Sequence, residues 1–321
     1  MKITVKDNSF RLKQPFIISR GARSFANVLT VEIEEHGFVG RGECVPYKRY
    51  GETLASVTET IQMVAPPLNR ETLQNMLPPG AARNALDCAL WDLEAKKNGK
   101  AVWQLAGIKQ LNPLISTYTI SLNTPEEMYS EALANRDRPV LKVKLGGNGD
   151  IARIETIRQA APDAKVIVDA NESCSQNDFP DLLAKLEELD ISLVEQPFPA
   201  GQDQFLNGFE SPIPICADES CHDRTSLDDL VGKYSMINIK LDKAGGLTEA
   251  LHLLKKGGEM GFDIMVGCMI GSSLAMAPAM LVAQYASIVD LDGPLLLAED
   301  RQHGLSFEGS KIFPPEATLW G

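Results

Sequence analysis

Val140-Leu141-Lys142-Val143-Lys144 is a short, largely apolar run that ends in a lysine, and similar runs follow it at a nearly constant spacing. The later runs end in, or lead directly into, Asp169, Glu195, Asp218 and Lys240. The steps between these residues, roughly 22 to 26 positions, match the length of one βα unit in a parallel barrel. Barrel enzymes keep their active sites at the C-terminal ends of the strands. The spacing therefore predicts a barrel with an active site at its rim.

From about residue 113 onward, short apolar runs alternate with amphipathic segments. This alternation predicts an α/β fold, a TIM-like (β/α)7β barrel of eight strands and seven helices over residues 113–292. The candidate strands are Leu114–Ser121, Val140–Lys144, Lys165–Asp169, Ser192–Glu195, Ile213–Asp218, Met236–Lys240, Asp263–Gly267 and Ser287–Asp290.

Residues 1–112 have a different pattern, which predicts an α+β domain that caps the barrel. A β-branched run in 26–35, a turn at His36-Gly37 and a returning run in 38–44 indicate an antiparallel hairpin. The period then becomes helical, most clearly over Arg83–Leu93, and a helix end is expected at Gly99. Residues 293–321 hold no further βα unit, so we expect them to complete the cap.

The composition is that of a soluble globular protein with an acidic balance, because 44% of the 321 residues are hydrophobic, 23% are charged and the net charge is −12. Such a charge disfavours nucleic acid and anionic membranes as partners. No apolar run is long enough to cross a membrane, and the first residues do not resemble a signal peptide. The six scattered cysteines indicate free thiols. We expect a cytoplasmic protein with a small-molecule substrate, and its oligomeric state, a homo-oligomer included, stays open.

Asp169, Glu195 and Asp218 would bring three carboxylates together from successive strand ends. A ligand set of oxygens without His or Cys favours Mg²⁺ over Zn²⁺. Taken singly, each residue could instead cap a helix or pair with a lysine, since Asp is a common N-cap. Their joint spacing favours the metal site. Asn171 and Glu219, close in sequence to two of the ligands, are expected to support them.

Lys144 and Lys240 flank the three carboxylate strands, so we expect them to face each other across the barrel mouth. A free lysine is a poor base at neutral pH because its pKa is about 10.4. Neighbouring cations, namely Lys142 and the metal, would lower that pKa. Two opposed lysines suit the removal of a proton from one face of a carbon and its delivery to the other. Solvated edge lysines are the alternative interpretation for Lys142 and Lys144.

These segments together resemble the enolase superfamily, in its muconate-lactonizing-type subgroup. The resemblance covers nearly the whole chain and rests on Lys142-Val143-Lys144, Asp169-Ala170-Asn171, Glu195-Gln196-Pro197, Ala217-Asp218-Glu219-Ser220, and Asn238-Ile239-Lys240 with Lys243-Ala244-Gly245-Gly246. Within the subgroup, the chain is most similar to the L-Ala-D/L-Glu dipeptide epimerases. That closer similarity rests on Ser19–Ser24, Tyr47–Glu52, Gly267–Ile270 and Asp290–Pro294.

The resemblance implies one Mg²⁺ per subunit on the three carboxylates, with Lys144 and Lys240 as the acid and base. It implies an isomerase that epimerises the C-terminal residue of L-Ala-D/L-Glu through a metal-stabilised enediolate, in the recycling of murein peptides. It further implies a set of residues that bind the dipeptide: Asp290 and Asp292 for its ammonium, Arg23 (or Arg20 in its place) for the glutamate carboxylate, and Thr119 and Lys142 in the pocket wall.

Other interpretations stay open. The same scaffold could carry β-elimination, as in o-succinylbenzoate synthase, or cycloisomerisation, although neither substrate has an ammonium for Asp290 and Asp292 to bind. A barrel that binds a metal without catalysis would leave the two lysines without a purpose. Asp292, directly before Gly293, could simply cap a turn.

Overall fold

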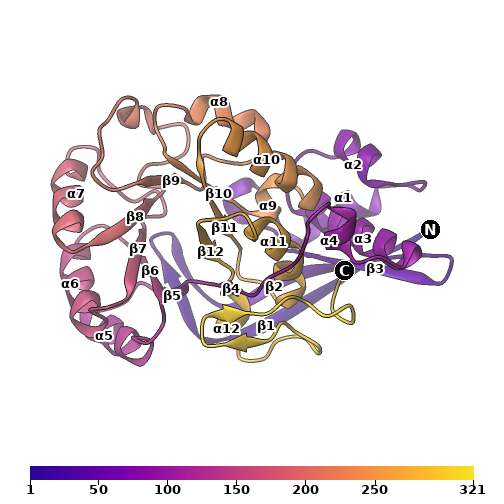
Figure 1. Cartoon of the computed structure of the whole chain (residues 1–321), viewed down its shortest axis with the longest axis horizontal. Helices are drawn as coiled ribbons and strands as arrows, with labels where there is room; N and C mark the ends of the chain where they lie inside the picture. The colour runs from indigo at the N-terminus through magenta and orange to yellow at the C-terminus, as the bar shows by residue number, and fades with distance from the viewer.

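The computed structural model describes the whole chain, residues 1–321, as a cap with an antiparallel sheet beside a barrel of eight parallel strands (Figure 1). The two chain termini lie on the cap side of the molecule, and the long β1–β2 ribbon extends from there toward the barrel (Figure 1). The cap therefore reaches the barrel with one hairpin, which matters for the site described below.

The cap sheet has the order β1-β2-β3, and its strands are β1 (Lys2–Ile18), β2 (Gly21–Glu35) and β3 (Phe38–Cys44). His36 and Gly37 form the turn between β2 and β3, with φ of 52° and 83°. Positive φ at both positions is the conformation of a two-residue hairpin turn. The predicted hairpin is confirmed.

Four helices cover the cap sheet or continue from it: α1 (Leu54–Gln62), α2 (Arg70–Met76), α3 (Ala81–Asn98) and α4 (Val102–Leu105). Helix α3 begins two residues before the predicted Arg83 and ends as predicted at Gly99, which is left-handed with φ 60°. It packs very close to β3 because Gly42 has no side chain, and a Cβ there would lie 2.1 Å from the carbonyl oxygen of Ala85.

The barrel sheet has the order β12-β11-β10-β9-β8-β7-β6-β5, and its strands run parallel. An isolated parallel bridge between Ser116 and Val289 joins its two edges. The predicted barrel is confirmed. Its strands are β5 (Tyr118–Ile120), β6 (Val140–Lys144), β7 (Lys165–Asp169), β8 (Ile191–Glu195), β9 (Ile215–Ala217), β10 (Met236–Ile239), β11 (Asp263–Gly267) and β12 (Ile288–Asp290).

The predicted first strand differs, because Leu114–Ser121 is divided between two sheets. At Ser116 the backbone N–H donates to the carbonyl of Ser310, whereas Thr117 already donates to Val289 of the barrel. The first part therefore belongs to a small separate sheet that also includes the C-terminal tail: β4 (Leu114–Ile115), β14 (Lys311–Ile312) and β13 (Phe307–Glu308).

The segments between the barrel strands are helical, with one exception. Between β8 and β9 the chain forms only a 3-10 turn at Gln204–Leu206, in a stretch rich in Pro and Gly, which disfavour a helix. The helices are α5 (Pro125–Ala134), α6 (Asp150–Ala160), α7 (Phe179–Glu188), α8 (Leu227–Leu230), α9 (Leu241–Ala244), α10 (Leu247–Glu259), α11 (Ser273–Ala283) and, after β12, α12 (Gly293–Leu296).

The C-terminal tail returns to the cap. The indole of Trp320 is buried and donates to the carbonyl of Cys88 in α3, and the Gly321 N–H donates to Asp92 of the same helix at 2.8 Å. The tail thereby ties the small third sheet to the cap. None of the helices has the length and apolarity that a membrane crossing requires.

An apolar layer fills the barrel beneath its rim. One side chain from each of six strands contributes to it, and on β7, β8, β11 and β12 the contributing residue lies two positions before the strand end. Because side chains alternate along a strand, the residue two positions later also points inward. The layer therefore forms the floor of the rim site: Ile167, Leu193, Cys216, Met236, Met265 and Ile288.

Candidate active site

The structure brings the five predicted rim residues together. Lys144, Asp169 and Glu195 end β6, β7 and β8 in direct register, while Asp218 and Lys240 follow β9 and β10 at once. All five are buried. In the closed eight-stranded barrel, three strands separate β6 from β10 in either direction, so Lys144 and Lys240 stand on opposite sides of the mouth.

Lys142 lies at the centre of the acidic groups. Its side chain is only 1% exposed, because it occupies an inward position where neighbouring strands carry the apolar floor. Its Nζ lies 2.6 Å from Glu195 Oε2, 2.7 Å from Asp290 Oδ2 and 3.2 Å from Asp169 Oδ2. From the sequence, Lys142 is expected in the pocket wall, whereas in the structure it links two predicted metal ligands to the eighth strand.

The two opposed lysines each contact one predicted metal ligand. Lys144 Nζ lies 2.5 Å from Asp169 Oδ2, and Lys240 Nζ lies 2.6 Å from Asp218 Oδ2. A further lysine, Lys243, donates to Asp218 Oδ1 at 2.6 Å and to the Asp218 carbonyl. Lys243 has no role predicted from the sequence, and its position three residues after Lys240 is the signal that indicates one.

Burial and ion pairing shift these groups in opposite directions. Burial disfavours the ammonium of Lys240, but Asp218 and Glu195 outweigh it and hold the pKa well above its ordinary value. Lys142 lowers the pKa of Lys240 as expected, but the two carboxylates outweigh this effect. Burial, together with the charge of Asp169, raises the pKa of Glu195 to about 7. The ammonium groups of Lys142 and Lys240 therefore do not fully offset the burial of the Glu195 carboxylate and the charges of the neighbouring acids.

The donor set fits a hard divalent cation, although the ammonium groups now hold the carboxylates. No three carboxylate, imidazole or thiolate groups converge on one point in the way a bound metal requires. However, the buried donors are all oxygens, and the side-chain oxygens of Asn171 and Asn238 beside them have no hydrogen-bond partner. Together with the raised pKa of Glu195, these features favour Mg²⁺ as an additional cation.

Asn171 and Glu219 both lie beside the predicted ligands. The Asn171 N–H donates to Asp169 Oδ1 at 2.9 Å, and its side-chain amide faces Glu219 Oε1 at 3.4 Å. Asn238, which sequence reasoning did not assign, donates to Glu195 Oε1 at 2.8 Å. These groups orient the carboxylates.

The cap closes the site with the β1–β2 hairpin. Arg20 donates to Glu219 Oε1 at 2.7 Å and to the Asn171 carbonyl at 2.8 Å, so its guanidinium is engaged by the protein. The Arg23 guanidinium lies over the Tyr47 ring, 5.3 Å from the centroid, and forms no ion pair. Both arginines line one cavity with Lys144 and Lys240. Of the two, Arg23 is the one available to a ligand.

The two aspartates of the eighth strand end have different surroundings. Asp290 accepts from Lys142 at 2.7 Å and from the Thr117 hydroxyl at 2.6 Å. Asp292 Oδ2 accepts only the Thr119 N–H, at 2.6 Å, and burial together with Asp290 raises its pKa to about 6. Asp290 is therefore already paired, while Asp292 retains an oxygen without a donor.

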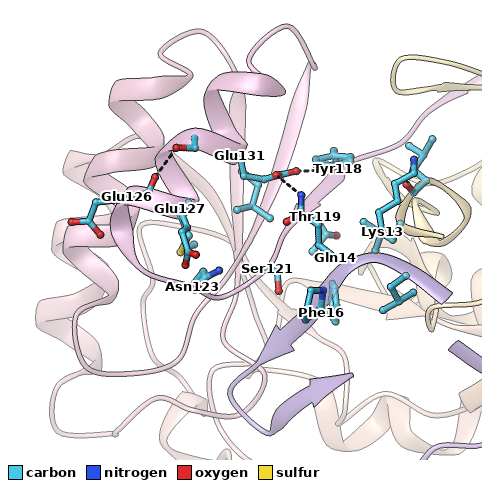
Figure 2. A pocket seen from close by; sticks show the side chains of 17 residues that line it. Lys13, Gln14, Phe16, Tyr118, Thr119, Ser121, Asn123, Glu126, Glu127 and Glu131 are labelled. Atoms are coloured by element: carbon cyan, nitrogen blue, oxygen red, sulfur yellow. Dashed lines mark hydrogen bonds between the residues drawn. The ribbon is translucent and has the colours of Figure 1, made fainter. Parts of the chain in front are cut away.

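Thr119 does not line the cavity of the two lysines but a second cavity, which lies between β1, β5, α5 and α12 (Figure 2). Figure 2 shows Phe16 of the cap on one side of this cavity and Glu131 of α5 hydrogen-bonded to Tyr118 on the other. Phe16 also lines the cavity of the two lysines. Phe16 thus borders both cavities.

Two family profiles match this layout. The profile described as mandelate racemase/muconate lactonizing enzyme, N-terminal domain, matches residues 1–107, and the one described as enolase C-terminal domain-like matches residues 127–313. The chain belongs to the enolase superfamily. The fold and the isomerase class expected from the sequence agree with this membership.

Relatives within the enolase superfamily are similar along nearly their whole length. L-Ala-D/L-Glu epimerase of Escherichia coli is 46% identical over 316 residues, which cover 97% of this chain and 98% of the relative. N-acetyl-D-glutamate racemase of a Pseudoalteromonas species is 45% identical over 300 residues, with 92% and 95% covered.

Solved enolase-superfamily structures superpose closely on the chain. An Agrobacterium tumefaciens protein with homology to dipeptide epimerases, crystallised with sodium and L-Ala-L-Glu, is 50% identical with a TM-score of 0.97, and 99% of each chain is covered. A dipeptide epimerase of Enterococcus faecalis with Mg and L-Leu-L-Tyr is 31% identical with a TM-score of 0.91, covering 98% and 97%.

Proposed function

We propose that this enolase-superfamily chain is a Mg²⁺-dependent dipeptide epimerase that inverts the second residue of L-Ala-D/L-Glu. The observation that carries the proposal is the placement of Lys144 and Lys240 on opposite sides of one buried cavity at the barrel mouth. An epimerase needs an acid and a base on opposite faces of the same carbon. The high similarity to the Escherichia coli epimerase supports the choice of reaction.

The two lysines exchange roles with the direction of the reaction. The lysine on the side of the departing proton must be neutral, and the opposite lysine donates a proton from its ammonium. Because Asp169 and Asp218 each contact one of these lysines, they hold the Nζ atoms near the mouth. Lys142, paired with three carboxylates, balances their charge rather than reaching the carbon.

Asp169, Glu195 and Asp218 would hold the Mg²⁺. When bound, the metal supplies positive charge that offsets the second negative charge developing on the substrate carboxylate as the α proton leaves. Asn171 and Asn238 keep the carboxylates of Asp169 and Glu195 in place through their hydrogen bonds, and Glu219 accepts from the Asn171 side chain.

Recognition of the two ends of the dipeptide falls to residues on opposite parts of the site. Asp292 binds the Thr119 N–H with Oδ2 and keeps its other carboxylate oxygen for the substrate ammonium, with Asp290 contributing negative charge nearby. Arg23 suits the glutamate side-chain carboxylate, since its guanidinium fork matches a carboxylate and no protein acid occupies it.

A second candidate is racemisation of N-acetyl-glutamate. It is favoured by the 45% identity to the Pseudoalteromonas racemase and by the pairing of Asp290 with Lys142, which leaves only Asp292 for an ammonium. Both reactions would use the same two lysines, and both substrates carry a glutamate side chain. They differ at the nitrogen end, where one substrate has an ammonium and the other a neutral amide.

The proposed activity fits a cytoplasmic step that recycles peptides of the cell wall, because those peptides carry L-Ala next to glutamate.

The test is a chiral assay of the purified protein with L-Ala-L-Glu, L-Ala-D-Glu, N-acetyl-D-glutamate and o-succinylbenzoate precursor, each with Mg²⁺ and with EDTA. We expect Mg²⁺-dependent inversion with kcat/KM highest for the Glu dipeptides. A higher kcat/KM for N-acetyl-D-glutamate would replace the dipeptide assignment by the racemase, and turnover of the precursor alone would replace both. Asp292→Asn should impair the dipeptide reaction more than the N-acetyl one.

A further inference from the structure

The hydroxyl of Tyr50 lies in the cavity of the two lysines and has no role in the reaction described above. The residue ends the 3-10 turn Lys48–Tyr50 in the cap and lines the cavity together with Arg23, Lys144 and Lys240. Its ring packs edge-on against His222, with centroids 4.7 Å apart, and against Tyr47 at 5.6 Å. The hydroxyl itself has no hydrogen-bond partner in the protein. A phenol in a half-buried position usually finds one.

The loop that carries Tyr50 is anchored on both sides of it. Before Tyr50, Arg49 forms two hydrogen bonds to the carboxylate of Glu172 in the barrel, at 2.8 and 2.7 Å. After it, Gly51 takes a left-handed conformation and the Glu52 carboxylate accepts the N–H of Tyr47 and the N–H of Ala81 at the start of α3. The phenol is therefore held over the mouth by the backbone, and its hydroxyl needs no rearrangement to meet a ligand.

The other polar groups that the cap presents to this cavity leave few donors for a substrate. Arg20 is occupied by Glu219 and by the carbonyl of Asn171, and the Tyr47 hydroxyl accepts from Arg20 at 3.3 Å. Arg23, Tyr47 and Tyr50 are the cap side chains in this cavity whose donors have no protein acceptor. The Tyr47 hydroxyl already accepts from Arg20, whereas the Tyr50 hydroxyl has no hydrogen bond to the protein, so an anionic ligand group that meets the Arg23 guanidinium satisfies it as well.

We infer that the Tyr50 hydroxyl and the Arg23 guanidinium together form the subsite for the side-chain carboxylate of the substrate, so that Tyr50 selects glutamate over its neutral isosteres. The inference rests on the proposed function in that the substrate carries a glutamate side chain. The acid–base lysines and the carboxylates of the rim lie on the barrel, whereas this subsite lies on the cap. Reaction and side-chain selection are thereby divided between the two parts of the molecule.

Tyr50→Phe removes the hydroxyl and keeps the ring contacts with His222 and Tyr47. We expect kcat/KM for L-Ala-L-Glu to fall at least about tenfold, mainly through KM, since a hydrogen bond to a charged group is lost. For L-Ala-L-Gln, whose side chain is neutral, we expect a change of less than about threefold. Tyr285→Phe is the matched control, because Tyr285 is 56% exposed and lies outside the cavity; it should leave both values unchanged.

An equal loss for the Glu and Gln dipeptides would overturn the inference, as would no loss for either. A selective fall in kcat with KM unchanged would also overturn it, because the hydroxyl would then act on the reacting carbon. Different results would contradict the inference about Tyr50 and the proposed function. If the wild-type protein inverts N-acetyl-D-glutamate and no dipeptide, the proposed function fails, and Tyr50→Phe is measured on that substrate against N-acetyl-D-glutamine with the same expected ratio.

Discussion

Arg20 and Glu219 form an ion pair, 2.7 Å from Nη2 to Oε1, that joins the tip of the β1–β2 hairpin to the barrel loop directly after Asp218. The side chain of Glu219 is 2% exposed and that of Arg20 is 27% exposed, so the carboxylate is buried while the guanidinium stays in partial contact with water. Its position ties the closing of the cap to the orientation of a predicted metal ligand. It also separates the roles of two neighbouring arginines, because Arg20 binds the protein and Arg23 faces the cavity.

This division predicts different effects for the two arginines. We expect Arg23→Ala to lower kcat/KM for L-Ala-L-Glu by about 10- to 100-fold and to change that for L-Ala-L-Gln only slightly, since the lost contact is with a charged side chain. Arg20→Ala should lower both by a similar factor, because it loosens the hairpin. Steady-state kinetics with the two dipeptides measure this. Equal losses for Arg23→Ala would assign the side-chain carboxylate to another residue.

The opposed lysines predict an unusual residual activity. Lys144→Ala and Lys240→Ala should each abolish epimerisation, because inversion needs both faces of the carbon. In D₂O, each variant should still exchange the α proton of one epimer, the one whose proton faces the remaining lysine. Mass spectrometry combined with chiral chromatography separates exchange from inversion. A variant that inverts its substrate at the wild-type rate would rule out the two-lysine mechanism.

The raised pKa of Asp87, which joins the cap to the barrel, predicts that the free energy of unfolding depends on pH. Asp87 is buried in α3, where it accepts from Thr248 of α10, and burial raises its pKa to about 6 from an ordinary 3.8. The folded protein therefore binds this proton more tightly than the unfolded chain. The resulting contribution to stability is fully present below pH 4 and is lost as the pH rises through about 6.

Asp87→Asn cannot titrate and serves as the reference. We expect the free energy of unfolding of the wild type, minus that of the variant, to decrease by up to about 3 kcal/mol between pH 4 and pH 7. Denaturant titrations at the two pH values measure it, and other titrating groups cancel in the difference. A difference that stays constant or grows with pH would show that Asp87 is not protonated in the folded protein.

The close packing of α3 on β3 at Gly42 predicts a loss of stability when a side chain is introduced there. Gly42→Ala would place a Cβ 2.1 Å from the Ala85 carbonyl oxygen, so the free energy of unfolding should fall by about 3 kcal/mol. Gly258→Ala in α10 is the control, because nothing lies within 4 Å of the new Cβ. There we expect a gain of up to about 1 kcal/mol from helix propensity. Thermal or urea denaturation compares the two, and similar effects would contradict the packing argument.

Much of the barrel could be predicted because its signals are local. An apolar run that ends in a charged residue marks both a strand and a rim position, and this holds for Lys144, Asp169 and Glu195. The central position of Lys142 also follows from strand alternation, since residues 142 and 144 point the same way. The motif alone indicates a pocket-wall position for Lys142, whereas the alternation indicates its central one.

Other features depend on partners that are distant in sequence. Leu114–Ser121 has one continuous apolar pattern, yet its first part pairs with Lys311–Ile312 of the tail, and no local signal indicates this change of sheet. The pKa of Lys240 depends on how closely Asp218 approaches it, which spacing alone does not give. Tyr50 lies in a loop, where the direction of a side chain is set by contacts such as Arg49 with Glu172.

The central claim is that two lysines invert the second residue of a dipeptide, and proton exchange tests it most directly. The wild-type protein is incubated with Mg²⁺ and L-Ala-L-Glu in D₂O, and the substrate is followed by NMR spectroscopy. The account predicts one deuterium at the α carbon of glutamate, none at the α carbon of alanine, and conversion to a mixture with L-Ala-D-Glu. Absence of deuterium at the glutamate α carbon, or its incorporation at alanine, would contradict the account.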